Sequence, residues 1–273
     1  MKLKSDGSLE RLKARLVIRG FTQQYGIDYQ EVFSPVVKMA TIRSIIALTA
    51  AKGWPLFQLD VNNAFLHGDL NEEVHMEVPK DIPNPSNKVC RPKKSLYGLK
   101  QASRQWFSKL SSTLLSLGYQ QSKNDYSLFI NKSSTTITIT AVYVDDIMLT
   151  GSNLAEIDHV KQHLHKCFGI KDLGRLHYFL GLEVNNILEG IVLSQKKFTA
   201  ESLQGSSLPN LKPTSTPLPL NCKLSPDEGD LLTDPTHYRI LVGKLNFLTH
   251  TRPDLSFTAQ ILSQFMQAPR TSH

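Results

Sequence analysis

The stretch TITITAVYVDDIMLT, residues 136–150, decides the fold. The segment from Thr136 to Val144 is rich in β-branched residues and alternates in polarity, which predicts a strand, and Ile147 to Thr150 predicts a second, shorter strand. Asp145 and Asp146 form the connection between the two strands. Because aspartate tolerates turn geometry, a plain hairpin turn is one explanation of this pair, and a pair of functional carboxylates is the other.

A third aspartate ends another predicted strand. Asp60 lies in the apolar segment Leu56–Val61, which Pro55 separates from a predicted helix over Thr41–Lys52. Carboxylates among apolar neighbours lose hydration, and carboxylates that lie close together repel each other. Divalent cations such as Mg²⁺ relieve both costs because hard cations take oxygen ligands. A pair of such ions can activate an attacking hydroxyl and stabilise the leaving oxygen in a phosphoryl transfer.

The rest of the chain predicts a mixed helical and stranded protein. It has 273 residues, 40% of them hydrophobic, and a formal net charge of +7, which favours a polyanionic partner such as nucleic acid. A proline-rich extended linker is expected at 209–226. The other expected elements are helices over Ser103–Leu117, Leu154–Phe168, Tyr238–Leu248 and Asp254–Met266, a hairpin of Phe179–Val184 with Ile191–Ser194, and an N-terminal strand alternating through Leu12, Leu16 and Ile18.

The segment from Lys88 to Lys109 carries several basic residues and neither Asp nor Glu. Tyr97, Trp106 and Phe107 add rings that could stack on bases. Two interpretations stay open, a surface that contacts phosphates and bases, or a solvated charged face. Contacts to phosphates would make binding sensitive to salt, because they release counterions.

Other chemistry has less support in the residues. His159 and His163 lie one helical turn apart, but Val160 stands where the motif H-E-x-x-H needs glutamate, so no zinc is expected. The chain carries no hydrolase-triad, P-loop or dinucleotide motif. With no signal peptide, no apolar stretch of membrane-spanning length and scattered cysteines, the chain is expected to be intracellular and cytoplasmic, without membrane association.

The residues around the aspartates resemble one family. YVDD, residues 143–146, is similar to the catalytic hairpin of reverse transcriptases, and LDVNNAF, residues 59–65, resembles the strand that bears their first metal-binding aspartate. Longer phrases resemble specifically the reverse transcriptase of copia-type LTR retrotransposons, which is the polymerase region of a Pol polyprotein. These phrases occur in that family's order and are Lys13–Gln23, Glu31–Val37, Lys94–Gln101, Lys171–Gly174, Tyr178–Glu183, Leu193–Lys197 and Thr251–Asp254.

The resemblance implies an α+β right-hand polymerase fold, with an antiparallel palm sheet backed by helices. Residues 1–185 would hold the fingers (about 1–40 and 67–95) and the palm (about 41–66 and 96–185). Residues 186–273 would form a partial thumb or connection-like region. The family extends beyond both ends of the chain, so the resemblance also implies a truncated region that belongs to a larger Pol polyprotein, carried in a virus-like particle if the element is active.

The implied activity is that of an RNA-directed DNA polymerase, with an RNA template, a DNA primer and dNTPs as partners. The alternatives are a catalytically inactive remnant that binds nucleic acid, and a subunit that pairs with an intact copy as a dimer.

The resemblance assigns the metal site by position. Asp60, Asp145 and Asp146 would be the catalytic residues, and together with the Val61 carbonyl they would hold two Mg²⁺ ions, for which Mn²⁺ could substitute. Asp146 is expected to contact metal less closely than Asp145, because consecutive residues near a strand point apart.

The resemblance also implies a nucleotide site. Phe65 would lie beneath the sugar and exclude a 2′-hydroxyl, although without the resemblance it is an ordinary core phenylalanine. Lys13 and Arg15 would hold the triphosphate, although they could equally be solvated charges. The segment under the templating base and nucleotide would supply Tyr97, Gly98, Lys100 and Gln101, with glycine allowing close approach of the backbone. Ala102-Ser103 departs from the family's Ser-Pro, and Phe179–Glu183 resembles the primer-grip hairpin.

Overall fold

The computed structural model describes residues 2–3, 8–12, 16–79, 82–83, 86–205, 213–219 and 223–273. The chain forms two compact units, Met1–Leu176 and His177–His273. The predicted boundary at 185/186 falls later than this division, inside strand β12 (Leu182–Ile187) of the second unit. The assignment of fingers, palm and thumb to these residues stays a prediction.

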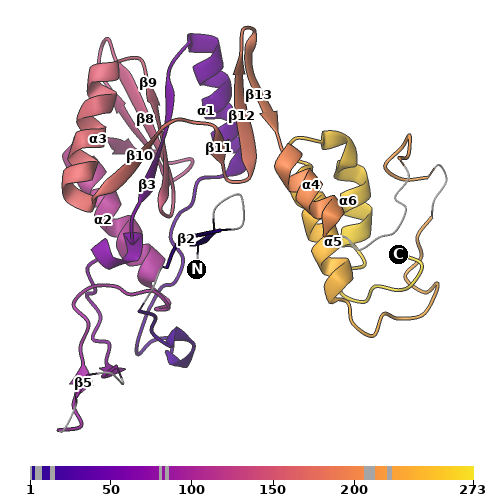
Figure 1. The fold of residues 1–273 in the computed structure, drawn as a ribbon, viewed down its shortest axis with the longest axis horizontal. Helices are drawn as coiled ribbons and strands as arrows, with labels where there is room; N and C mark the ends of the chain where they lie inside the picture. The colour runs from indigo at the N-terminus through magenta and orange to yellow at the C-terminus, as the bar shows by residue number, and fades with distance from the viewer. Residues whose placement is uncertain are drawn as a thin grey trace. The chain divides into compact units, whose positions relative to one another are not determined.

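The first unit is built on a six-stranded sheet in the order β10-β3-β9-β8-β7-β6, in which neighbouring strands are antiparallel (Figure 1). β3 lies between β10 and β9, so it is paired on both sides. The strands are β3 (Leu56–Val61), β6 (Gln120–Gln121), β7 (Leu128–Lys132), β8 (Ile137–Tyr143), β9 (Asp146–Gly151) and β10 (Ile170–Arg175). Two smaller pairs are β1 (Lys2–Leu3) with β2 (Leu9–Arg11), and β4 (Met76–Glu77) with β5 (Val89–Cys90).

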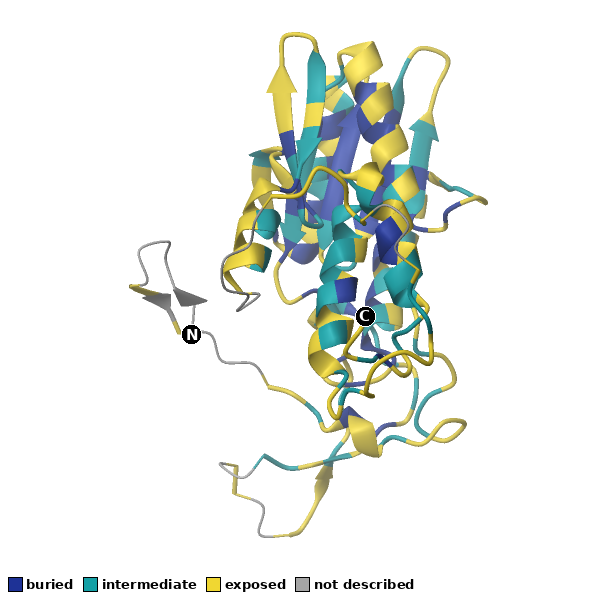
Figure 2. Cartoon of the chain, turned by 90° about the vertical axis from the view of Figure 1, so that its right-hand side faces the viewer, coloured by how far each residue is buried: buried dark blue, intermediate teal, exposed yellow. Residues whose placement is uncertain are grey.

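Three helices cover the sheet, α1 (Met39–Lys52), α2 (Ala102–Ser116) and α3 (Leu154–Phe168), with α2 and α3 on one side and α1 on the other in Figure 1. The inner stripes of α2 and α3 pack on the sheet in one core cluster. Figure 2 shows buried residues along the strands of this sheet. The fully buried members include Leu59, Trp106, Leu110, Phe129, Ile147, Leu149, Ile157 and Leu164. Burial of each such side chain contributes roughly 1.5–3 kcal/mol to folding.

The alternation of strand side chains divides the sheet into two faces. Leu59 on β3 and Ile147 on β9 belong to the core beneath α2 and α3. Successive side chains in a strand point to opposite faces, so Gln58, Asp60 and Asp146 share the other face. The acidic side chains therefore lie away from the α2/α3 core.

The start of α1 is held from a distant part of the chain. Thr41 was the predicted first residue, but the helix begins at Met39, and its N-cap, Lys38, has no side-chain cap. Instead, the buried carboxylate of Asp125 accepts hydrogen bonds from the Lys38 amide (3.2 Å) and the Thr41 hydroxyl (2.6 Å). The end is as expected, with Gly53 in the left-handed conformation.

The predicted helices and strands of the first unit are largely confirmed, with two corrections. The hairpin turn consists of Val144 and Asp145, because Asp146 is the first residue of β9. At the N-terminus, Val17 makes only an isolated bridge to Tyr97, and residues 13–15 of the expected strand lie outside the described residues. Strands β4, β5, β6, β7 and β10 were not predicted.

The second unit combines a small sheet with helices. The expected hairpin is confirmed as β12 and β13 (Gly190–Ser194), but a turn at Leu180-Gly181 splits off β11 (Tyr178–Phe179). The helices are α4 (Lys196–Gln204), which was not predicted, α5 (Thr236–Leu248) and α6 (Ser256–Ser263), which follows a 3₁₀ turn at Pro253–Leu255. The described part of the linker contains neither helix nor strand.

Within the described residues, no helix combines the length and the apolar composition needed to cross a membrane. The observed mixture of helices and antiparallel sheet confirms the expected α+β class.

Candidate active site

The sheet brings the three aspartates together. Asp60 on β3 stands directly opposite Asp146 on β9, and directly opposed residues have side chains on the same face. Tyr143 pairs with Asp146 and closes the two-residue turn that contains Asp145. The Val61 amide donates a hydrogen bond of 2.9 Å to the Asp145 carbonyl, which ties this turn to the end of β3.

The three carboxylates have different surroundings. Asp145 is exposed, whereas Asp60 and Asp146 are half-buried. The Gln58 side-chain amide donates a hydrogen bond of 3.1 Å to Asp146. Burial raises the pKa of Asp146, the Gln58 hydrogen bond opposes it, and the neighbouring charges of Asp145 and Asp60 raise it further, so the pKa lies above its ordinary value. Gln58 was not predicted as a site residue, although its position two residues before Asp60 places it on the same strand face.

The donor set suits a hard divalent cation. Among the residues that the structure describes, no three His, Cys, Asp or Glu side chains are gathered into a group that could hold a metal ion. Asp60 and Asp145 nevertheless sit at neighbouring strand ends, and the raised pKa of Asp146 shows the cost of burial and like charge that a cation would relieve. Carboxylate oxygens and the backbone oxygen of Val61 are ligands that Mg²⁺ accepts.

The turn itself is strained and is held by a buried tryptophan. Val144 has φ of 54°, a conformation that β-branched residues rarely adopt. The indole N–H of Trp106, on α2, donates a hydrogen bond of 2.7 Å to the Val144 carbonyl. Sequence reasoning placed Trp106 among rings that stack on bases. That interpretation was wrong, because Trp106 is only 1% exposed and belongs to the core.

Two of the predicted nucleotide-site residues form a ring pair. Phe65 lies in the 3₁₀ turn Ala64–His67 that follows β3, and its ring centroid is 4.9 Å from that of Tyr97. The turn is held close to α2 at Gly68, where an added Cβ would lie 2.8 Å from the Gln105 carbonyl carbon. Lys13 and Arg15, predicted to hold the triphosphate, lie outside the described residues.

The segment after Tyr97 packs against the N-terminal part of the unit. A Cβ on Gly98 would lie 2.0 Å from the Ile18 carbonyl oxygen, so the protein's own backbone already requires glycine there. Gln101 is fully buried, and its side chain bonds to the Gln23 side chain (3.1 Å) and the Asp28 carbonyl (3.0 Å). Of the predicted residues here, Lys100 has an exposed side chain and Gln101 does not.

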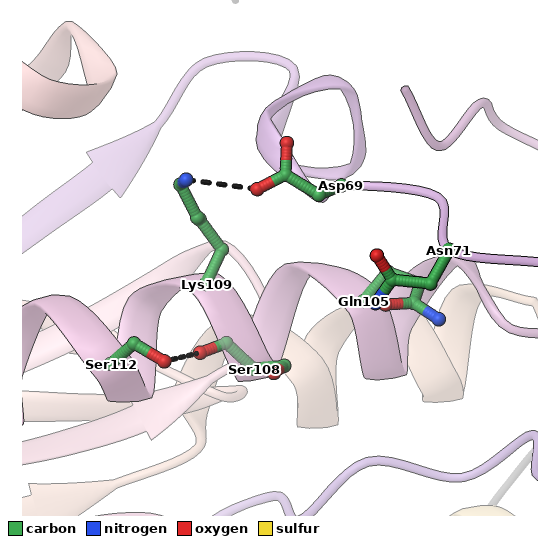
Figure 3. Close-up of a pocket in the computed structure, with 6 residues that line it drawn as sticks. All are labelled: Asp69, Asn71, Gln105, Ser108, Lys109 and Ser112. Carbon is green, nitrogen blue, oxygen red and sulfur yellow. Dashed lines mark hydrogen bonds and ion pairs between the residues drawn. The ribbon is translucent and has the colours of Figure 1, made fainter. Parts of the chain in front are cut away.

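Several basic side chains of the segment 88–109 form ion pairs with acidic side chains outside it. Lys94 and Lys109 both contact the Asp69 carboxylate, and their hydrogen bonds lower the pKa of Asp69 to about 2. Figure 3 shows Lys109 and Asp69 beside a polar pocket of about 210 Å³ along α2. Arg104 pairs with Glu31 in the same way. The acidic residues around the segment were known from the sequence, but their pairing was not anticipated. Phe107 is half-buried on the core.

The two histidines of α3 lie at its surface. His159 is exposed and His163 is half-exposed, as their helical positions predict.

The fold is an α+β fold in which Asp60, Asp145 and Asp146 lie around one end of an antiparallel sheet. Residues 1–219 match the family model described as "Reverse transcriptase (RNA-dependent DNA polymerase)". The chain belongs to this reverse transcriptase family.

Curated relatives confirm the resemblance to copia-type elements. Over its whole length the chain is 44% identical to the Retrovirus-related Pol polyprotein from transposon RE2 of Arabidopsis thaliana, of which it covers 19%. It is 39% identical over its whole length to the Pol polyprotein from transposon TNT 1-94 of Nicotiana tabacum, of which it covers 22%. The chain thus spans about a fifth of the length of these relatives.

Among solved structures, the chain is similar to a foamy viral protease-reverse transcriptase in complex with double-stranded DNA. The TM-score is 0.36 at 13% identity, and the match covers 79% of this chain and 36% of the other.

Proposed function

We propose that this chain is a polymerase region that catalyses RNA-directed DNA synthesis, with an RNA template, a DNA primer and dNTPs as substrates. The observation that carries the proposal is the cross-strand pair of Asp60 and Asp146, with Asp145 in the adjoining turn. Family membership supports the reaction class. Its place of action would be the cytoplasm, in a virus-like particle if the element is active.

The reaction is a nucleotidyl transfer. The primer 3′-oxygen forms a bond to the α-phosphorus of the dNTP, the bond from that phosphorus to the bridging oxygen of the β-phosphate breaks, pyrophosphate leaves, and the hydroxyl proton passes to solvent. Asp60, Asp145, the Val61 carbonyl and, less closely, Asp146 would hold two Mg²⁺ ions, or Mn²⁺ in their place. When bound, such ions neutralise charge and favour the attacking oxyanion.

The remaining residues bind and orient the substrates. Gln58 keeps the carboxylate of Asp146 engaged, which leaves exposed Asp145 as the freer ligand. The Phe65–Tyr97 ring pair offers an apolar floor for a nucleotide sugar, and Phe65 would exclude a 2′-hydroxyl. Lys13, Arg15 and the exposed Lys100 would neutralise phosphates. The buried Gln101 and the exposed Gly98 would shape the segment beneath the nucleotide.

Primer extension on an RNA template with Mg²⁺ and dNTPs tests the proposal. Extension should occur with the parent chain, disappear in Asp60→Asn and Asp145→Asn, and persist in Asp158→Asn, whose carboxylate is exposed on α3. Template–primer binding, measured in parallel, should be retained by all variants.

Other outcomes separate the alternatives. Extension that survives Asp145→Asn would refute the proposed site. Template binding by a parent chain that never extends the primer would identify a non-catalytic remnant. Extension that appears only after an intact relative is added would identify a pairing subunit.

A further inference from the structure

The catalytic turn has two conformations available to it. Two-residue hairpin turns are usually type I′ or type II′, which differ in the orientation of the central peptide. In this turn, the central peptide joins Val144 to Asp145. Val144 has φ of 54°, while Asp145 is outside the left-handed region, which is the type II′ pattern.

The local sequence does not select this conformation. Type II′ favours glycine at the position that Val144 occupies, and a β-branched residue is strained there. Aspartate at the next position tolerates a positive φ, so rotation of the central peptide towards type I′ meets little local resistance. Such a rotation would reverse the Val144 carbonyl and redirect the side chain of Asp145.

Trp106 forms a hydrogen bond with the Val144 carbonyl, whose direction this rotation would reverse. Its indole N–H donates to the Val144 carbonyl at 2.7 Å, across 38 positions of the chain. The indole cannot easily move away, because it is 1% exposed and packs edge-on against Phe168, with centroids 5.0 Å apart. The ring of His67, 5.8 Å away, lies against the same indole. Reversal of the carbonyl would leave a buried N–H without its partner, which carries a desolvation cost.

We propose that Trp106 is a positioning residue, whose indole N–H locks the peptide between Val144 and Asp145 and so fixes the direction of the Asp145 carboxylate. The proposal rests on the proposed polymerase function for its catalytic consequence. Trp106 touches neither substrate nor metal and acts only through the turn. The hydrogen-bond donor lies on α2, whereas the aspartates belong to the sheet and its turn.

The test removes the N–H while keeping the ring. The chain has two tryptophans, Trp106 and the half-buried Trp54. Trp54→Phe leaves Trp106 as the only indole, and this variant is both the background for the test and its matched control. In that background, Trp106 is replaced by its benzothiophene analogue, in which sulfur takes the place of N–H and the shape is retained. Trp106→Phe is the genetically simpler companion variant.

Amide hydrogen exchange is read first, because it does not depend on activity. The Val61 amide donates to the Asp145 carbonyl, so loosening the turn should speed its exchange about threefold to tenfold, the equivalent of one ordinary hydrogen bond. The Leu59 amide, farther from the turn on the same strand, should be unchanged. In primer extension, kcat should fall by about the same factor while the KM for dNTP stays within about twofold.

Each outcome decides the proposal. Faster exchange at Val61 alone, with lower kcat, supports it. Unchanged exchange at Val61, equal acceleration at Leu59, or faster exchange with unchanged kcat overturns it. If the unsubstituted chain does not extend primers, the proposed function is refuted, and the exchange measurement still decides whether Trp106 holds the turn.

Discussion

Replacement of Asp125 by asparagine should destabilise the first unit strongly, although the shape of the side chain hardly changes. Asp125 is 6% exposed. Its carboxylate accepts hydrogen bonds from the Lys38 amide, the Thr41 hydroxyl, and the amide and hydroxyl of Ser127. Asparagine keeps one acceptor oxygen but turns an N–H₂ group towards the remaining donors. The substitution also weakens the contacts that Asp125 makes with Lys38 and Thr41 at the start of α1.

The size of the effect follows from the hydrogen bonds. Those to a charged group contribute roughly 1.5–3 kcal/mol each, so partial loss of this set should lower the free energy of unfolding by about 3 kcal/mol. For a protein of this size, such a loss lowers Tm by roughly 6–12 °C. Chemical and thermal unfolding at pH 7 would measure it, with Asp158→Asn as the exposed control, expected within about 0.5 kcal/mol of the parent.

The pH dependence gives a second, independent check. Burial by itself would raise the pKa of Asp125, but the hydrogen bonds from Ser127, Thr41 and Lys38 outweigh it and lower the pKa. A depressed pKa contributes stability that is complete above the unfolded value of about 3.9 and is lost as the pH falls through the folded value. The gap between parent and Asp125→Asn should therefore narrow below about pH 4. Equal stability at pH 7, or a gap that widens in acid, would refute the reasoning.

Three further changes have specific expected results. Asp69→Asn should free Lys94 and Lys109 for phosphates and so raise the affinity for single-stranded RNA. The slope of log affinity against log salt concentration should steepen by about 0.7 per added phosphate contact, and an unchanged slope would identify a solvated face. Gly20→Ala would place a Cβ 1.8 Å from the Gly98 carbonyl oxygen and should cost about 1–3 kcal/mol in unfolding free energy, whereas Gly243→Ala, with nothing within 4 Å, should cost nothing. Phe65→Val should increase incorporation of ribonucleotides relative to deoxyribonucleotides in single-nucleotide extension, and an unchanged ratio would show that Phe65 is only a core residue.

Sequence patterns correctly predicted the helices and strands that are determined by residues close together in the chain. The stripe Ile157, Val160 and Leu164 indicates α3 because it repeats at the helical period, and the β-branched run in β8 indicates a strand. β10 was missed because most of its side chains are exposed and it forms by pairing with β3, far away in the chain. No window of sequence contains that partner.

The same distinction applies to the candidate site. The aspartates could be singled out because carboxylates in apolar strands are unusual, and the resemblance indicated which of them belong together. The contact of Trp106 with Val144 could not be read from the sequence, because its donor and acceptor lie on different elements and an indole at a helical core position looks like ordinary packing. The pairing of Lys94 and Lys109 with Asp69 is likewise a tertiary contact.

The position of β10 has a consequence for biosynthesis. β3 is flanked on one side by β9 and on the other by β10, where Lys171 stands opposite Asp60. While the ribosome has not yet delivered residues 170–175, the strand that carries Asp60 has one row of backbone groups open to any other strand, and such open edges drive aggregation. A premature stop codon upstream of Ile170 should therefore yield an insoluble product, even though every aspartate of the site is already encoded.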